Sequence, residues 1–240
     1  MHDADDEKVL RTSIGEFPLN EYRLKENGRE WRILHVGAVI SRDEESEYLL
    51  NPDESLPYGV TLWASAIALA HELASRDDFH AKSAIELGAG TGLPGIVAAT
   101  NGAALTQTDS NYVALRLAQR NLALNDLKTV RQRHVDWANW DDVSQYELIL
   151  GSDILYSEAS HPNLRRIFDN NLTPGGRILL SDPFRAMSLR LLESLEKDGW
   201  QISMTKYRIG EDASPRPIGI FELTLPTTQP ARPNAEARTK

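Results

Sequence analysis

The sequence predicts an α/β protein in which helices cover a mostly parallel sheet that ends in an antiparallel hairpin. Strand-like and helix-like segments alternate through the middle of the chain, as in a parallel sheet with helical crossovers. Two more strand-like segments follow with only a loop between them, so we expect them to pair antiparallel at the sheet edge. The 240 residues, 41% of them hydrophobic, suit one such domain with an extension.

The spacing of apolar residues predicts the individual elements. A first helix is expected from about Val60 to Ser75, where Leu62, Ala66 and Leu69 fall near helical spacing. Strands are predicted at Ser83–Leu87, Ala104–Thr108, Thr129–Val135, Glu147–Gly151 and Arg177–Ser181. Further helices are predicted at Pro94–Thr100, Tyr112–Leu124, Pro162–Asn170 and Ala186–Asp198. The closing hairpin pairs Trp200–Ile209 with Ile218–Leu225.

The chain divides into an N-terminal extension (1–57), a main domain (58–225) and a flexible tail (226–240) that is polar and rich in proline. Residues 1–30 are polar, and we expect them to be loosely structured. Trp31–Ser41 is rich in aromatic and β-branched residues and is predicted to be a strand. Tyr48–Leu50 is its predicted hairpin partner, so the extension contains a β-hairpin.

Composition narrows the classes of function. The formal net charge of −9 argues against a broad phosphate-binding surface, so we expect no nucleic-acid partner. The chain has no cysteine and therefore no disulfide, thiolate metal site or cysteine nucleophile, and we predict no metal site. The acidic N-terminus does not resemble a secretory signal, and no apolar run approaches the roughly 20 residues that span a bilayer. We expect a cytoplasmic protein without membrane contact.

A glycine-rich turn follows the first strand of the predicted sheet, in the stretch "SAIELGAGTGLPGIVAAT". Glycine permits unusual backbone angles there and lets the backbone approach a ligand closely. The spacing Gly90-x-Gly92-x-x-Gly95 matches the dinucleotide fingerprint. Glu86-x-Gly88-x-Gly90-x-Gly92 resembles instead motif I of class I S-adenosylmethionine (SAM) methyltransferases. A tight turn without a ligand is the third interpretation.

Polar residues follow the next two strands. Asp109 lies 21 positions after Gly88. An acidic side chain at this place can accept hydrogen bonds from both hydroxyls of a ribose. Asp109 and Ser110 are also suitable N-caps for the following helix. After the third strand, Asp136 can accept from an adenine amine and Trp137 can stack on the ring, unless Trp137 is a core aromatic.

The fourth strand runs into the sequence "GSDILY", which contains Ser152, Asp153 and Tyr156. In an open parallel sheet, the carboxyl ends of the strands face the ligand. We therefore interpret Asp153 and Tyr156 as a polar pair near the reacting group. The alternative is that Asp153 caps a turn and Tyr156 packs in the core.

Five stretches in chain order resemble the seven-β-strand protein lysine methyltransferase-like family, which includes the electron-transfer-flavoprotein β-subunit and chaperone lysine methyltransferases. They are "LPYGVTLWASAIALAHEL", "IELGAGTGLPGIVAA", "TDSNYVALRLAQRNLALN", "VDWANW" and "LILGSDILYSE". The resemblance covers roughly Tyr58 to Ser181. It implies a Rossmann-like class I methyltransferase sheet, SAM as the cofactor and S-adenosylhomocysteine (SAH) as the product.

The resemblance also implies roles for individual residues. Trp63 would flank the cofactor from the helix before the first strand, and Asp153 and Tyr156 would face the methyl acceptor as the catalytic pair. The cofactor-binding residues implied are Trp63, Glu86, Gly88, Gly90, Asp109, Ser110, Asp136, Trp137 and Ser152.

The leading hypothesis is therefore an N-methyltransferase that acts as a monomer on a protein lysine. A small amine of the nicotinamide type is the alternative acceptor. An NAD-dependent oxidoreductase and a non-catalytic SAM-binding module are the competing classes. The sequence "SDPFR" after the fifth strand lacks the second proline of the signature of nucleic-acid amine methyltransferases. It also follows the fifth strand rather than the fourth, so it does not support that substrate.

Overall fold

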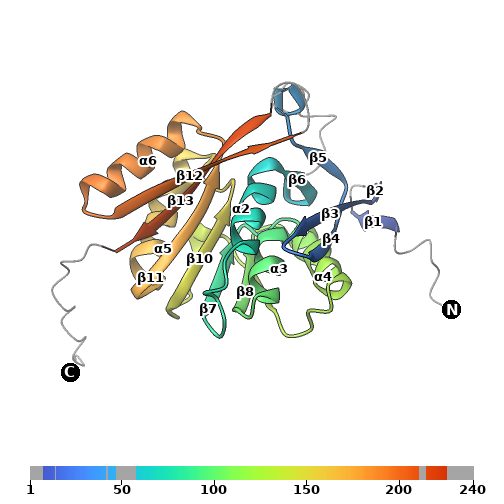
Figure 1. Ribbon diagram of the computed structural model, residues 1–240, viewed down its shortest axis with the longest axis horizontal. Helices are drawn as coiled ribbons and strands as arrows, with labels where there is room; N and C mark the ends of the chain where they lie inside the picture. The colour runs from blue at the N-terminus through green and yellow to red at the C-terminus, as the bar shows by residue number, and fades with distance from the viewer. Residues whose placement is uncertain (1–7, 14, 42, 47–57, 211–214, 226–240) are drawn as a thin grey trace.

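The computed structural model describes residues 8–13, 15–41, 43–46, 58–210 and 215–225. Its centre is a seven-stranded sheet with the order β12-β13-β11-β10-β7-β8-β9 (Figure 1). Its strands are β7 (Ser83–Leu87), β8 (Ala104–Asp109), β9 (Arg131–His134), β10 (Tyr146–Ser152), β11 (Leu172–Asp182), β12 (Gln201–Ile209) and β13 (Arg216–Thr224). The predicted α/β class is confirmed.

The pairing directions agree with the prediction. β9, β8, β7, β10 and β11 are parallel to one another, and β13 runs antiparallel between β11 and β12. The chain order reverses at β7, which has β8 on one side and β10 on the other. Ligands of open α/β sheets bind beyond the carboxyl ends of the strands at such a reversal. The turn after β7 is therefore where a ligand site is expected.

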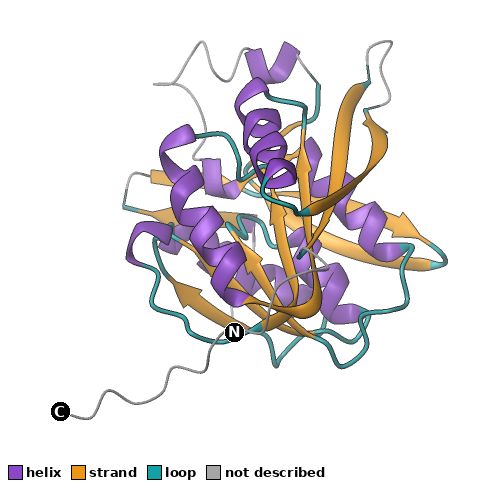
Figure 2. Cartoon of the chain, turned by 90° about the vertical axis from the view of Figure 1, so that its left-hand side faces the viewer, coloured by secondary structure: helices purple, strands orange, loops and turns teal. Residues whose placement is uncertain are grey.

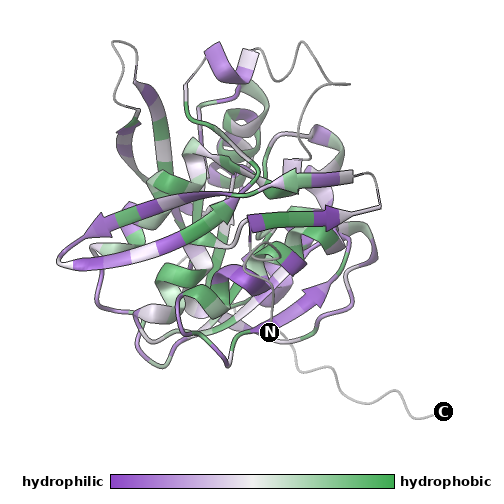
Figure 3. Cartoon of the chain, turned by 90° about the vertical axis from the view of Figure 1, so that its right-hand side faces the viewer, coloured by the Kyte–Doolittle hydropathy of each residue, from purple (hydrophilic) through white to green (hydrophobic). Residues whose placement is uncertain are grey.

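Helices pack on both faces of the sheet (Figure 2). They are α2 (Ala64–Ala74), α3 (Leu93–Thr100), α4 (Tyr112–Leu124), α5 (His161–Asn171) and α6 (Ala186–Lys197). Successive side chains of a strand point to opposite faces. Leu148 and Leu150 thus join the core beside α2 and α3, while Ile149 joins the core beside α5 and α6. Figure 3 shows hydrophobic segments concentrated along these inner strands and helices.

The N-terminal extension is more ordered than the sequence suggested. It contains β1 (Val9–Thr12), β2 (Gly15–Pro18), β3 (Asn20–Glu26), β4 (Arg29–His35) and β5 (Gly37–Val39). The prediction of a loose segment over residues 1–30 was wrong for 9–12 and 15–26, which form strands. Leu24, Trp31 and Ile33 are buried on one side of the β3–β4 hairpin, while the charged residues between them keep the sequence polar overall.

The predicted strand Trp31–Ser41 is divided into β4 and β5. β4 pairs with β3, whereas β5 pairs in parallel with β6 (Thr61–Trp63). The predicted partner Tyr48–Leu50 lies outside the described residues, as does the predicted tail, 226–240. Within the described part of the chain, no helix has both the length and the apolar character that a membrane span requires.

Asn121 of α4 and Asn125, the C-cap of this helix, join the extension to the main domain. Asn125 Oδ1 accepts from the Arg32 amide at 3.0 Å, and its Nδ2 donates to the Arg32 carbonyl at 2.7 Å. Asn121, fully buried, pairs in the same way with both backbone groups of Leu34 and also donates to the Thr91 carbonyl at 2.8 Å. The side-chain amides thus satisfy the open edge of β4, and Asn121 connects it to the glycine-rich turn.

Candidate active site

The glycine-rich turn joins β7 to α3 through left-handed backbone. Gly88, Gly90 and Gly92 have φ values of 64°, 55° and 82°. A side chain makes such a conformation costly, and glycine avoids that cost. Gly92 is the N-cap of α3, and Pro94 lies in its first turn, where no backbone donor is needed. The turn therefore brings bare backbone to the carboxyl edge of the sheet.

Glu86 supports this turn from beneath. Its Oε1 accepts from the Gly95 amide at 3.0 Å, and its Oε2 accepts from Gln107 Nε2 at 2.9 Å. The residue is 1% exposed, and burial raises the pKa of its carboxyl to about 7. In the structure, both carboxylate oxygens of Glu86 thus hold the protein around the turn.

Asp109 at the end of β8 also faces the turn. Its Oδ2 accepts from the Gly90 amide at 2.9 Å, and its Oδ1 accepts from the Asn111 amide at 2.7 Å. Each carboxylate oxygen keeps a further lone pair for a ligand hydroxyl. The expected capping by Asp109 or Ser110 does not occur, because Asn111 is the N-cap of α4. Ser110 is exposed, and its carbonyl accepts from His134 Nε2 at 2.8 Å.

Trp137 lies against the turn from the side of β9. A Cβ placed on Gly88 would be 3.3 Å from Trp137 Cζ2 and 3.0 Å from Ile154 Cγ2. Asp136, which is exposed, caps the short 3-10 helix η3 (Trp137–Asn139) by accepting from the Ala138 amide at 2.9 Å. The indole and the turn thus form neighbouring surfaces at the carboxyl edge.

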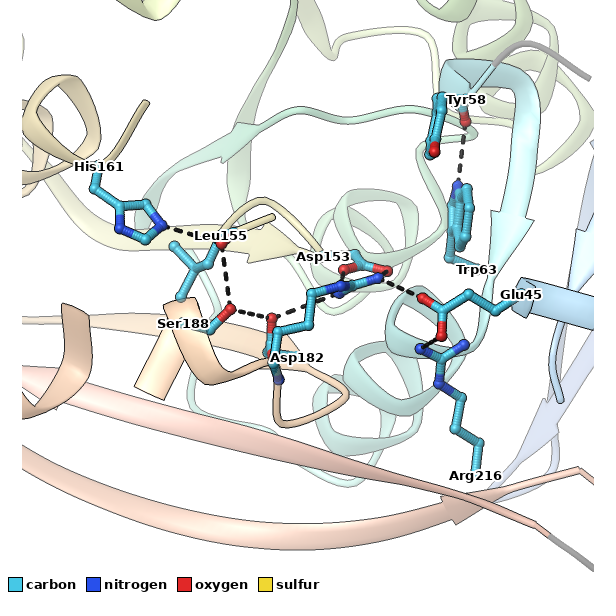
Figure 4. Close-up of polar contacts among 10 residues, drawn as sticks. Glu45, Tyr58, Trp63, Asp153, Leu155, His161, Asp182, Ser188 and Arg216 are labelled. Atoms are coloured by element: carbon cyan, nitrogen blue, oxygen red, sulfur yellow. Dashed lines mark hydrogen bonds and ion pairs between the residues drawn. The ribbon is translucent and has the colours of Figure 1, made fainter. Parts of the chain in front are cut away.

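Three aromatic rings lie nearly parallel beside the tip of β10. The Tyr58 ring, from the 3-10 helix η2 (Tyr58–Val60), is 5.3 Å from the Trp63 ring and 6.5 Å from the Tyr156 ring, at interplanar angles of 9° and 13°. Tyr58 is 55% and Tyr156 56% exposed. Trp63 Nε1 donates to the Tyr58 carbonyl at 3.2 Å (Figure 4). Trp63 ends β6 and precedes α2, so its predicted place within a helix was wrong.

Asp153 is held by its backbone at the tip of β10. Its φ of 56° lies in the left-handed region, and its amide donates to the Ser181 carbonyl at 2.8 Å. Burial raises the pKa of the Asp153 carboxyl to about 6, although the neighbouring Arg185 guanidinium acts in the opposite direction. Ser152, half-buried, ends β10 one residue earlier, in register with Ser181 of β11.

Arg185 contacts the Asp153 carboxylate through both terminal nitrogens, with 3.4 Å between Nη2 and Oδ2 (Figure 4). Arg185 Nη2 also donates to Glu45 Oε1 at 2.7 Å, and Arg216 holds the other oxygen of Glu45. Asp182 Oδ2 lies 3.6 Å from Arg185 Nη1. We call Glu45, Asp153, Asp182, Arg185 and Arg216 the charge cluster.

His161 is placed beside the same tip. Its Nε2 lies 3.0 Å from the Leu155 carbonyl, which can only accept, so this nitrogen carries the proton. The contact makes His161 a support for the loop after β10. Among the described residues, no group of three or more His, Asp or Glu side chains is arranged to hold a metal ion.

The structure brings most of the predicted site residues together at one edge. The negative charges of Asp109, Asp153 and Asp136 contribute to a raised pKa of the Tyr156 hydroxyl, after the larger effect of its partial burial. These acceptors suit a ligand with hydroxyls, an amine and a flat ring. They suit a pyrophosphate poorly, because like charges repel.

A family model described as lysine methyltransferase matches residues 43–195, more than half of the sequence. The chain belongs to the lysine methyltransferase family. The match includes the glycine-rich turn, the tips of β8, β9 and β10, and Arg185.

Two relatives are protein N-lysine methyltransferases METTL21A. The Danio rerio protein is 33% identical, over 71% of this chain and 71% of its own length. The Xenopus tropicalis protein is 38% identical over 55% of this chain, and the match spans 64% of that relative, slightly under two thirds. The structure of the glycopeptide N-methyltransferase MtfA complexed with SAM aligns with a TM-score of 0.54 at 16% identity, over 65% of this chain and 92% of that chain. This likeness concerns the fold, and it confirms the predicted Rossmann-like methyltransferase sheet.

Sequence reasoning missed three residues of this lysine methyltransferase site. Tyr58 lies within a stretch that resembles the family, but no role for it follows from the resemblance. Arg185 ends the sequence "SDPFR", which has no diagnostic value, and Glu45 lies in a segment without a motif. A cation three residues after the end of β11 was the available signal for Arg185, because Asp153 directly follows the neighbouring strand β10.

Proposed function

We propose that the chain is a SAM-dependent N-methyltransferase that methylates a lysine of a protein substrate. The observation that carries the proposal is the position of Asp153 and Tyr156 at the tip of β10, beside the glycine-rich turn of a lysine methyltransferase family member. The dinucleotide interpretation of the glycine spacing finds no support in the family match.

The described residues fit SAM at the carboxyl edge. Gly88 and Gly90 offer backbone without side chains, and Asp109 offers free lone pairs for the ribose hydroxyls. Trp137 would stack on the adenine, and Asp136 would accept from its amine. Trp63 and Ser152 would flank the methionine part. Glu86 would act on this part of the site from beneath the turn, and Ser110, exposed at the β8 tip, would line the cofactor beside Asp109.

Methyl transfer requires alignment of the acceptor nitrogen and exclusion of water. SAM supplies the methyl group on a sulfonium, which is a good leaving group. Asp153 would hold the incoming ammonium by a charge-assisted hydrogen bond, and the exposed Tyr156 ring would orient it. The ammonium, whose ordinary pKa is about 10.4, must lose its proton to water before attack. The protein therefore acts through positioning.

Cofactor binding gives the first prediction. We expect SAH, and not NAD, to bind in calorimetry. Asp109→Ala should weaken SAH binding by about 1.5–3 kcal/mol, the usual worth of hydrogen bonds to a charged group. Ser203→Ala, at an exposed position of the edge strand β12, is the control and should bind SAH normally. Normal SAH binding by a folded Asp109→Ala protein would remove Asp109 from the ribose site.

The acceptor gives the second prediction. We expect tritiated SAM and this protein to label a protein band in a cell lysate, on lysine. An acidic protein attracts basic segments, so labelling should fall as salt rises. Label that resists protease and runs with small molecules would favour the small-amine alternative. Label released by nuclease, or mapped to another amino acid, would contradict the lysine proposal. The expected cytoplasmic location and monomeric state stay predictions.

A further inference from the structure

The carboxylate assigned to the acceptor already has a cationic partner within the protein. Arg185 presents two nitrogens to the two oxygens of Asp153, in the fork geometry that makes guanidinium–carboxylate pairs strong. An acceptor ammonium would need the same oxygens. Substrate and Arg185 therefore compete for one position.

The charges of the charge cluster are not balanced, and one more positive charge would balance them. It contains three carboxylates and two guanidiniums, which leaves one negative charge in excess among the described residues. Asp182 and Arg216 are buried, and the side chains of Asp153, Glu45 and Arg185 are mostly so. Buried charges are costly unless they are paired, so a bound cation would stabilise the cluster.

If Arg185 leaves Asp153, it still has two other carboxylates beside it. Glu45 already accepts from its Nη2 at 2.7 Å, and Asp182 Oδ2 lies 3.6 Å from its Nη1. Exchange of one carboxylate for another avoids leaving a buried charge unpaired. The cost of freeing Asp153 is therefore smaller than the cost of breaking an isolated buried pair.

Aromatic rings flank the side from which a cation would enter. Partial burial raises the pKa of the Tyr58 hydroxyl, and the charges of Arg185, Glu45 and Asp153 act on the same hydroxyl. The ring of Tyr156 is the next in the stack, and both are more than half exposed. Aromatic faces attract ammonium groups.

We propose that Arg185 determines the specificity of the acceptor site by occupying Asp153 until a cationic side chain displaces it onto Glu45 and Asp182. The inference rests on the proposed function. Only an acceptor that replaces the guanidinium charge gains access to Asp153, so neutral amines are disfavoured.

The test measures binding of n-butylammonium chloride, a mimic of the lysine side chain, to the SAH-bound protein by calorimetry. We expect about tenfold tighter binding in Arg185→Gln, because this substitution removes the internal competitor for Asp153. A factor of ten corresponds to about 1.4 kcal/mol. Glu45→Gln removes the alternative partner of Arg185 and should weaken binding several-fold. Arg190→Gln, on the exposed face of α6, is the matched control and should leave binding unchanged.

Unchanged or weaker binding in Arg185→Gln would overturn the inference. Unaltered SAH affinity serves as the check on folding, and Arg185→Lys, which keeps the charge with a single donor group, should fall between the wild type and Arg185→Gln. Asp153→Asn in the Arg185→Gln background should abolish the gain; a retained gain would show that the cation binds elsewhere. The readout needs no methyl transfer. If the protein methylates lysine but Arg185→Gln does not tighten cation binding, this inference is refuted and the proposed function stands. If the cation site responds as expected but the protein transfers no methyl group, the proposed function is refuted and this inference stands.

Discussion

Asp153→Asn should lower the rate of methyl transfer by about a hundredfold and leave SAH affinity nearly unchanged. The substitution keeps the side-chain volume and removes the charge that would hold the acceptor ammonium. Asp153 has a left-handed backbone conformation, and its amide donates to the Ser181 carbonyl. Because the backbone fixes this position, a small shift of a neighbouring residue would not bring another carboxylate to the same place. Misplacement of a reacting group by about 1 Å can cost a hundredfold in rate.

The measurement pairs single-turnover transfer with SAH calorimetry. Tyr156→Phe should also reduce transfer, by a smaller factor, because the ring that flanks the acceptor remains. Asp141→Asn is the control, since this exposed carboxylate pairs with Arg133 away from the site. If Asp153→Asn loses SAH affinity in proportion to its loss of rate, Asp153 belongs to the cofactor site and not to the acceptor.

Gly95→Ala should destabilise the protein by about 3 kcal/mol, although helix propensity alone favours alanine by roughly 1 kcal/mol. A Cβ at Gly95 would lie 2.2 Å from Glu86 Oε2 and 2.9 Å from Leu105 Cδ2. Overpacking of this kind costs about 1–3 kcal/mol. Displacement of Glu86 would also remove one of the two hydrogen bonds of the buried Gln107 Nε2 and leave that N–H unpaired, at about 1–3 kcal/mol; the second bond, to the Gly92 carbonyl, remains.

Urea unfolding of Gly95→Ala and of a control glycine variant tests this prediction. Gly28 has a φ of 76° and open space around its Cβ position, so Gly28→Ala should cost only the backbone strain, about 1–2 kcal/mol. Equal losses in the two variants would show that the contact between Glu86 and the glycine-rich turn contributes little. A stabilised Gly95→Ala protein would mean that Glu86 relaxes freely.

The glycine-rich turn shows how far local sequence can predict a site. Gly88, Gly90 and Gly92 were expected to need unusual backbone, and all three have positive φ. The partner of Glu86 was not predictable from spacing, because the Gln107 side chain reaches it from the next strand. A motif therefore indicated where a carboxylate lies but left open whether it faces the ligand or the turn.

The extension shows a second limit. Charged residues mask the period-two alternation of β3 and β4, so composition indicated a loose segment. Burial of Leu24 and Trp31 becomes evident only when the hairpin packs on the domain. The edge of β4 is then satisfied by Asn121 of α4 and by the C-cap Asn125, which lie far along the chain.

The sequence by itself determined the alternation of strands and helices, the closing hairpin, the glycine-rich turn and the polar residues at the strand tips. These features depend on neighbours in the chain, whose periodicity is visible without a structure. Only the tertiary structure decided that Arg185 pairs with both Asp153 and Glu45. Those pairs join residues 32 and 140 positions apart, and their geometry depends on how β10, the loop before α6 and segment 43–46 pack together.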